Sequence, residues 1–239
     1  MACAALFATC AVDLLRPQVA EAGCRLVRAA GWRLEVPPQG CCGQVAWNNG
    51  EIEAARRMAR RVMDRFGGAD RVVVPSASCA ATMRLHYPTL FDGAPRARQF
   101  AQRVRELSEF LVEVEATPPA ARRPRRVAWQ EGCSARRELQ LGGAPRALLA
   151  RAGHQVLEIA EAEVCCGFGG TFCVKFPEIA DRMAEDKARR VLEVHPEVLS
   201  GTDLPCLLHV GGKLSRLAGG DAIEVSHLAE LLDPGESRG

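Results

Sequence analysis

Cys41-Cys42-Gly43 and Cys165-Cys166-Gly167 are two copies of one triplet, and a solitary cysteine lies before and after each copy. The two series of cysteines are Cys10, Cys41, Cys42, Cys79 and Cys133, Cys165, Cys166, Cys206. Corresponding cysteines lie 123 to 127 positions apart, so eight of the eleven cysteines recur in the same order. Chance placement would not produce this order. The chain is therefore predicted to be a duplicated unit in which each copy gathers four thiols at one site.

Both halves also repeat a pattern of short strands and amphipathic helices. Strands are expected at residues 4–10, 32–36, 71–75, 126–129 and 156–159, and helices at 17–30, 49–66, 95–111, 145–152 and 177–194. Asn49 is expected to cap the start of the second helix. This alternation predicts an α/β fold of two pseudo-symmetric βαβ-type repeats with largely parallel sheets. The repeats are assigned to residues 1–112 and 126–239, joined by a linker at 113–125.

The repeated cysteines occupy positions that suit a shared site. In parallel sheets, ligands gather at the carboxyl ends of the strands, where loops lead into helix N-termini. Adjacent cysteines on a regular strand would point to opposite faces, but a tight loop can turn both toward one point. Gly43 and Gly167 supply the backbone freedom for that loop. Gly169 and Gly170 add backbone N–H groups that could donate hydrogen bonds to cluster sulfurs.

Thiolates are soft ligands that favour iron–sulfur clusters, zinc or cuprous ions. Structural zinc sites use closely spaced cysteine pairs, whereas the spacings here are long, so an iron–sulfur cluster in each repeat is favoured and zinc stays open. All eight repeated cysteines are the candidate metal ligands. The other three have no counterpart in the opposite half and are expected to be small apolar residues, although Cys173 is near enough to the second triplet to serve as a reserve ligand. These three are Cys3, Cys24 and Cys173.

Composition excludes several classes of function. The 239 residues carry a formal net charge of +2, which argues against a dedicated nucleic-acid-binding protein. No apolar run is long enough for a membrane span, and the first twelve residues lack the basic start of a secretory signal. A cytoplasmic protein is therefore expected, in which clustered thiols serve metal binding or redox chemistry. No flavin or nicotinamide motif is evident.

The duplicated Cys…Cys-Cys-Gly…Cys arrangement resembles the cysteine-rich CCG domain family. This family includes the cysteine-rich subunit of heterodisulfide reductase and the iron–sulfur subunits of glycolate and anaerobic glycerol-3-phosphate dehydrogenases. The resemblance covers nearly the whole chain and is most specific at residues 41–50, 75–79, 165–179 and 206–212. It implies a 4Fe-4S cluster in each repeat, in a subunit of a cytosolic complex that oxidises L-lactate or a similar small 2-hydroxy acid. The partners it implies are a ferredoxin-like iron–sulfur protein and a third small subunit.

The chain departs from the heterodisulfide reductase pattern at the last cysteine of each copy. Where that enzyme has Cys-x-x-Cys, this chain has Thr82 and His209 in the final position. Each site thus has four thiols instead of five, which favours a simple four-thiolate cluster. His209 lies one helical turn beyond Cys206 and is the candidate proton acceptor. Two other functions stay open: a thiol–disulfide reductase that uses the adjacent cysteines, and a zinc-binding scaffold.

Overall fold

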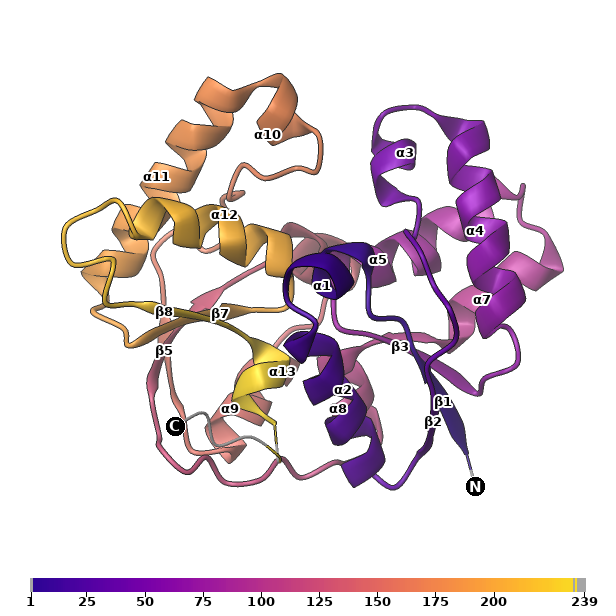
Figure 1. Ribbon diagram of the computed structural model, residues 1–239, viewed down its shortest axis with the longest axis horizontal. Coiled ribbons are helices and arrows are strands. Elements are labelled where there is room, and N and C mark those ends of the chain that lie inside the picture. The colour runs from indigo at the N-terminus through magenta and orange to yellow at the C-terminus, as the bar shows by residue number, and fades with distance from the viewer. Residues whose placement is uncertain (1, 234, 236–239) are drawn as a thin grey trace.

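The computed structural model describes residues 2–233 and 235, and it contains two four-stranded sheets in which every strand pairing is parallel (Figure 1). The outermost residues of the two predicted repeats, Met1 and 236–239, lie outside the described residues. The strand orders are β2-β1-β3-β4 and β6-β5-β7-β8, so the second sheet repeats the first. The strands are β1 (Cys3–Leu6), β2 (Arg33–Glu35), β3 (Arg71–Val74), β4 (Val104–Glu106), β5 (Arg126–Gln130), β6 (Gln155–Glu158), β7 (Val198–Gly201) and β8 (Glu224–His227). The predicted α/β fold of two repeats is confirmed.

The helices of the first half connect these strands in the expected order. Apolar side chains at helical spacing face the sheet, as Val19, Leu26 and Val27 do in α2. The elements are α1 (Cys10–Leu15), α2 (Gln18–Ala29), α3 (Gln44–Asn48), α4 (Ile52–Phe66), α5 (Ala77–Ala81), the π-helix η1 (Thr82–His86), α6 (Tyr87–Leu90), α7 (Pro95–Arg103) and α8 (Leu107–Glu113).

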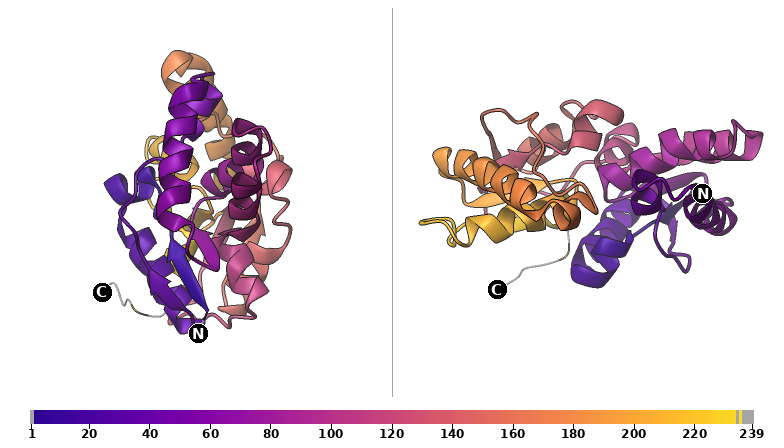
Figure 2. Two further views of the ribbon diagram at one scale, coloured as in Figure 1. Left: turned by 90° about the vertical axis from the view of Figure 1, so that its right-hand side faces the viewer. Right: turned by 90° about the horizontal axis from the view of Figure 1, so that it is seen from above.

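The second half has the same plan, with its longest helix again after the cysteine triplet. Its elements are the π-helix η2 (Ser134–Glu138), α9 (Ala144–Arg151), α10 (Phe172–Lys175), α11 (Pro177–Glu193), α12 (Leu204–Leu214) and α13 (Leu228–Leu231). Seen from above, the two halves lie side by side (Figure 2). The triplets precede α3 and α10, which stand on the same side of the molecule (Figure 1).

A shared hydrophobic core joins the halves. One buried cluster combines Leu6, Leu26 and Phe110 from the first half with Trp129 and Leu148 from the second. Helix α13, at the end of the chain, packs against α2 near its beginning, and α8 packs against α9. Because each half buries apolar surface of the other, the relative position of the two repeats is set by core packing.

Two contacts across the interface are related by the internal symmetry. Helix α5 of the first half packs against η2 of the second, and α12 of the second packs against α1 of the first. In each pair, the element that follows one repeat's third strand meets the element that follows the other repeat's first strand. The elements that carry the solitary cysteines are therefore brought together from both repeats.

Two local predictions were wrong. The segment 95–111 is not one helix, because the three-residue strand β4 interrupts it and pairs with β3. Asn49 does not cap the start of α4, whose N-cap is Glu51; it ends α3 instead. Its side-chain Oδ1 accepts hydrogen bonds from the Thr171 hydroxyl at 2.9 Å and the Lys175 ammonium at 2.7 Å, so Asn49 links the two halves.

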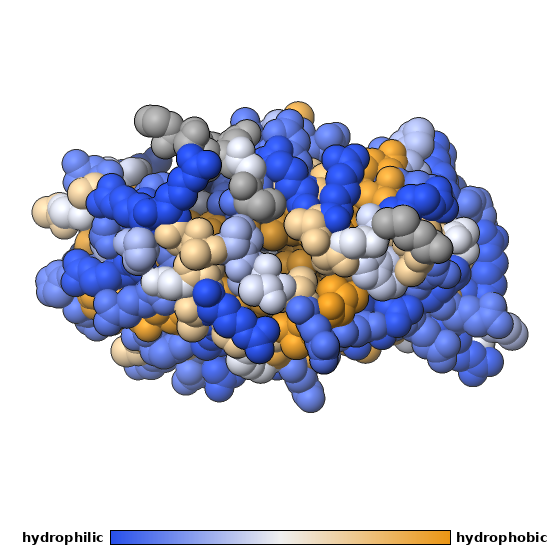
Figure 3. Space-filling model, turned by 90° about the horizontal axis from the view of Figure 1, so that it is seen from below, coloured by the Kyte–Doolittle hydropathy of each residue, from blue (hydrophilic) through white to orange (hydrophobic). Residues whose placement is uncertain are grey.

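The side of the molecule opposite α3 and α10 is covered mostly by hydrophilic residues, with hydrophobic ones showing through between them (Figure 3). Within residues 2–233 and 235, no helix has the length and apolar character needed to cross a membrane.

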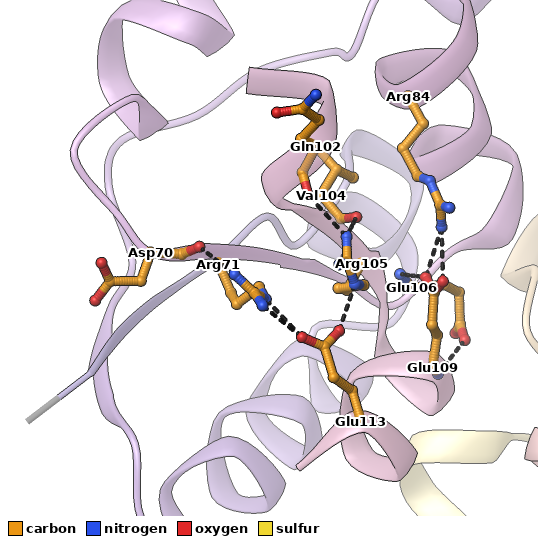
Figure 4. Close-up of polar contacts among 9 residues, drawn as sticks. All are labelled: Asp70, Arg71, Arg84, Gln102, Val104, Arg105, Glu106, Glu109 and Glu113. Carbon is orange, nitrogen blue, oxygen red and sulfur yellow. Dashed lines mark hydrogen bonds and ion pairs between the residues drawn. The ribbon is translucent and has the colours of Figure 1, made fainter. Parts of the chain in front are cut away.

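Glu106 at the end of β4 is a fully buried carboxyl group (Figure 4). Its Oε2 accepts hydrogen bonds from the backbone N–H of Ser108 at 2.7 Å and from the Ser108 hydroxyl, whereas Oε1 has no partner among the described residues. Burial raises the pKa of Glu106 from 4.5 to about 7. His227, in the corresponding position at the end of β8, is also fully buried, and burial lowers its pKa from 6.5 to about 4.

These two groups make opposite contributions to stability as pH changes. The folded chain keeps the Glu106 proton up to about pH 7, whereas the unfolded chain loses it near 4.5, so stability falls as pH rises through this window. The folded chain keeps His227 neutral down to about pH 4, whereas the unfolded chain binds a proton there near 6.5. Stability therefore falls as pH falls through this window. We therefore expect the free energy of unfolding of Glu106→Gln, relative to that of the unmodified chain, to rise by up to about 3 kcal/mol between about pH 4.5 and 7. Urea denaturation of both proteins across this range measures the difference, and parallel pH profiles would contradict it.

Candidate metal centre

The internal topology of each sheet places the solitary cysteines next to each other. Strands β1 and β3 pair directly, and the chain leaves their carboxyl ends into α1 and α5, which carry Cys10 and Cys79. In the second sheet, β5 and β7 lead to Cys133 and Cys206 in the same way. The order of strands reverses at these central pairs, which is where ligands bind in open parallel sheets.

Each Cys-Cys-Gly triplet forms a tight loop. Gly43 and Gly167 have φ values of 92° and 88°, which residues with a side chain rarely adopt. The backbone N–H of Gly43 donates to Cys41 Sγ at 3.3 Å, and that of Gly167 donates to Cys165 Sγ at 3.4 Å. Both loops thus support a thiolate at the first cysteine of the triplet.

The four thiols of each repeat lie in a chain of contacts. In the first set, Cys41 interacts with Cys10 and Cys42, and Cys42 Sγ lies 3.3 Å from Cys79 Sγ. In the second set, Cys133, Cys165, Cys166 and Cys206 interact in the same sequence. The second cysteine of each triplet is the most enclosed of its set, with both Cys42 and Cys166 only 2% exposed.

The hydrogen bonds among the thiols of each set give them different pKa values. Hydrogen bonds from Cys10 and Cys42 lower the pKa of Cys41 to about 2, and the pKa of Cys165 is likewise lowered to about 2 by Cys133 and Cys166. The donating thiols have raised pKa values, because the neighbouring thiolate and burial both favour their neutral form. The first cysteine of each triplet is therefore the group that ionises first.

One cavity of about 430 Å³ is lined by all eight cysteines. Gly169, Gly170 and Thr171 also line it, as do Val45 and Asn48 from the opposite repeat. Asn49 and Lys175 join the two halves beside it through their hydrogen bond. The predicted convergence of far-separated sulfurs therefore occurs twice, and the two sets face each other across a common space.

Asp203 is a site residue that the sequence patterns did not reveal. It is 4% exposed, lines the cavity and precedes α12 as Ser76 precedes α5. Asp203 Oδ1 accepts hydrogen bonds from the Ser76 hydroxyl at 2.8 Å, the Ser78 backbone at 3.0 Å and the Ser78 hydroxyl at 2.8 Å. The equal spacing of Ser76 from Cys79 and of Asp203 from Cys206 was a signal that could have identified it.

The remaining predicted residues have varied positions. His209 Nε2 lies 3.3 Å from the Ala180 carbonyl and its ring meets Phe168 edge to face, and His209 is not among the residues that line the cavity. The Thr82 hydroxyl donates to the Ser78 carbonyl at 2.8 Å. Cys173 donates to the Gly170 carbonyl at 3.3 Å, while Cys3 lies in β1 and Cys24 in α2, away from both sets. The role of His209 stays a prediction.

The chemistry of the ligand atoms fits a cluster bound by thiolates. Each repeat offers four sulfur ligands around one cavity, with backbone N–H groups directed at a ligand sulfur. Among the described residues, no group of three or more Cys, His, Asp or Glu side chains has the arrangement that would hold a single metal ion.

The sequence is similar to those of known proteins. The family model for the cysteine-rich CCG domain matches residues 4–84 and 127–211. The chain is 37% identical over 235 residues to "Lactate utilization protein A" of Geobacillus kaustophilus, covering 95% of this chain and 97% of the relative. It is 38% identical over 240 residues to the protein of the same name from Exiguobacterium, covering 97% of each.

Solved structures give only a distant likeness. An aspartate racemase homologue from Pyrococcus horikoshii is 13% identical, covers 97% of this chain and 95% of its own, and reaches a TM-score of only 0.32. Each of the two family matches spans one of the four-thiol sets. The chain therefore belongs to the CCG cysteine-rich domain family, together with the proteins named lactate utilization protein A.

Proposed function

We propose that this chain is an iron–sulfur electron-transfer subunit of a system that oxidises lactate or a similar 2-hydroxy acid to the 2-oxo acid. The observation that carries the proposal is the convergence of two four-thiol sets on one cavity. The name of the relatives, lactate utilization protein A, supplies the substrate class. A cluster held by each set would accept and release one electron at a time.

The residues of the chain would divide this work. The eight thiols bind the clusters, and the N–H groups of Gly43 and Gly167 stabilise the negative charge on Cys41 and Cys165. The triplet cysteines Cys42 and Cys166 lie deepest, whereas Cys10 is exposed. Cys10 therefore marks the side on which the first set exchanges electrons with a partner protein, for which a ferredoxin-like iron–sulfur protein and a third small subunit are the candidates.

The cavity wall disfavours the hydroxy acid itself. Asp203 and the eight thiols, which in this proposal bind the clusters as thiolates, give the wall a negative character, which repels a carboxylate. Lactate is therefore oxidised on another subunit of the system in this proposal. The present chain takes up the electrons.

A thiol–disulfide reductase is the second candidate. It is favoured by the placement of two nucleophilic thiolates, Cys41 and Cys165, on the wall of one cavity that is large enough for a small disulfide. In that case reduction of a disulfide would be lost when Cys165 or Cys166 is replaced by serine.

Anaerobic purification with quantification of iron, acid-labile sulfide and zinc tests the proposal. Two 4Fe-4S clusters predict about eight iron and about eight sulfide per chain, with brown absorbance that bleaches on reduction. Zinc without sulfide after anaerobic purification and reconstitution would overturn it in favour of the scaffold function. Disulfide turnover by the metal-free protein would instead support the reductase.

A further inference from the structure

Lys187 on α11 is a fully buried lysine that interacts electrostatically with two thiols of the second set. Its ammonium donates hydrogen bonds to the carbonyl of Glu161 at 3.0 Å and to the carbonyl of Ala162 at 3.2 Å. These carbonyls belong to the loop that leads into Cys165 and Cys166. A buried lysine is uncommon and costs stability unless it is paired, so its position requires an explanation.

The charge of Lys187 acts on the cysteines of its own repeat. Lys187 interacts electrostatically with Cys133 and Cys166, and Arg137 interacts with Cys133 and Cys165. Arg137 also donates to the carbonyl of Glu163 at 3.0 Å, in the same loop. The second set of thiols thus lies within the electrostatic reach of two cations that also hold its loop.

The other charged groups around Lys187 are Arg190, which opposes its charge, and Glu163, which favours it. Arg190 is itself paired with the Glu161 carboxylate. Burial lowers the pKa of Lys187, and the thiols raise it. A negatively charged thiolate site would favour the ammonium form of Lys187 over its neutral form. The hydrogens of that ammonium group are directed at two carbonyl oxygens.

The first repeat has no equivalent of these cations. Gly43 lies against Ala55 and Met58 of α4, and Gly167 lies against Ala180 and Met183 of α11, so the two helices correspond with an offset of 125. This offset makes buried Val62 the counterpart of Lys187. With the offset of 123 between Cys10 and Cys133, exposed Leu14 is the counterpart of Arg137.

We propose that Lys187, assisted by Arg137, gives the second thiolate site a higher reduction potential than the first. This inference rests on the proposed electron-transfer function. A positive charge near a cluster stabilises its reduced, more negative form, and burial of Lys187 strengthens the effect because little water screens it. With a cluster held by each set, one electron would pass from the first site, which would be oxidised, to the second site, which would be reduced. The electrons enter from a one-electron carrier that oxidation of the 2-hydroxy acid has reduced.

Redox titration followed by absorbance and electron paramagnetic resonance tests the inference. Cys42→Ser isolates the second site and Cys166→Ser isolates the first, so each midpoint potential can be assigned. The second site is expected to be at least tenfold easier to reduce, which for one electron is 59 mV. Lys187→Met should lower the second potential by a similar amount and leave the first unchanged.

Two further variants keep the test decisive. Arg137 is exposed, so Arg137→Leu should fold normally and give a smaller shift of the same sign at the second site. Lys213 belongs to the same repeat but pairs with Asp181 at the surface, so Lys213→Met should shift neither potential. Lys187→Gln keeps a hydrogen-bond donor for the loop carbonyls but removes the charge, so it should lower the second potential as Lys187→Met does.

The possible results divide clearly. Equal or reversed potentials in the two isolated sites, or an unchanged second potential in both Lys187→Met and Arg137→Leu, would overturn the inference while leaving the proposed function intact. Absence of iron and sulfide from the unmodified protein would overturn both, and it would be recognised before any titration.

Discussion

Replacing Cys42 by serine is expected to remove the iron held by the first set of thiols and to leave the second set occupied. Cys42 is 2% exposed and lies between Cys41 and Cys79, so no solvent molecule can easily take its place. A serine hydroxyl ionises far less readily than a thiol and is a harder ligand, which iron–sulfur clusters disfavour. Iron per chain, measured after anaerobic reconstitution, should fall to about half.

Cys166→Ser is the matched experiment at the second set and should give the same loss. Cys24→Ser is the control, because Cys24 lies on α2 outside both sets and its replacement should leave iron and sulfide unchanged. An equal loss of iron in Cys24→Ser would show that the decrease reports general instability. Full iron content in Cys42→Ser would contradict the assignment of this thiol as a ligand.

The repeated cysteines could be predicted as a site because parallel sheets follow simple rules. Once β1 and β3 are recognised as strands, the loops that follow them must leave from the same edge of the sheet, which brings Cys10 and Cys79 together. The glycine after each cysteine pair similarly indicated a tight loop, and Gly43 and Gly167 have φ values of 92° and 88°. The contact of both sets with one cavity did not follow from these rules, because it depends on how the repeats pack.

Strand β4 and Asn49 show where sequence patterns fail. β4 has three residues between two helices, too few to display alternation, and its pairing with β3 decides its conformation. Asn49 was assigned to the wrong helix end for a related reason. It satisfies the preference for a cap, but its side chain is taken up by Thr171 and Lys175 from 122 and 126 positions away.

Asp203 and Lys187 could not be assigned a role without the structure. Asp203 is held by Ser76 and Ser78 of the other repeat, a contact that no local pattern contains. Lys187 falls on the same helical face as the buried Ala180, Ala184 and Ala188, and a charged residue within such a face was a visible signal. Only the surrounding carbonyls and thiols reveal why a charge is tolerated there.

Gly167→Ala is expected to destabilise the fold by about 4 kcal/mol and to lower the iron content of the second set. The added Cβ would lie 2.8 Å from the Ala180 carbonyl oxygen and 2.9 Å from Met183 Cβ, and the φ of 88° is unfavourable for alanine. Both obstacles are parts of α11, so the triplet loop must move away from its helix. Denaturant unfolding and iron analysis of the same preparation measure the two effects.

Two other glycines separate strain in the backbone from steric overlap. Gly31 has a φ of 81° with nothing within 4 Å of an added Cβ, so Gly31→Ala should cost only the conformational term of about 1 kcal/mol. Gly43 has a φ of 92° and its nearest neighbours at 3.4 Å, so Gly43→Ala should lie between the two. If all three substitutions cost the same, backbone conformation alone sets the requirement for glycine, and the close approach of the second triplet to α11 contributes nothing to holding Cys165 and Cys166 in place.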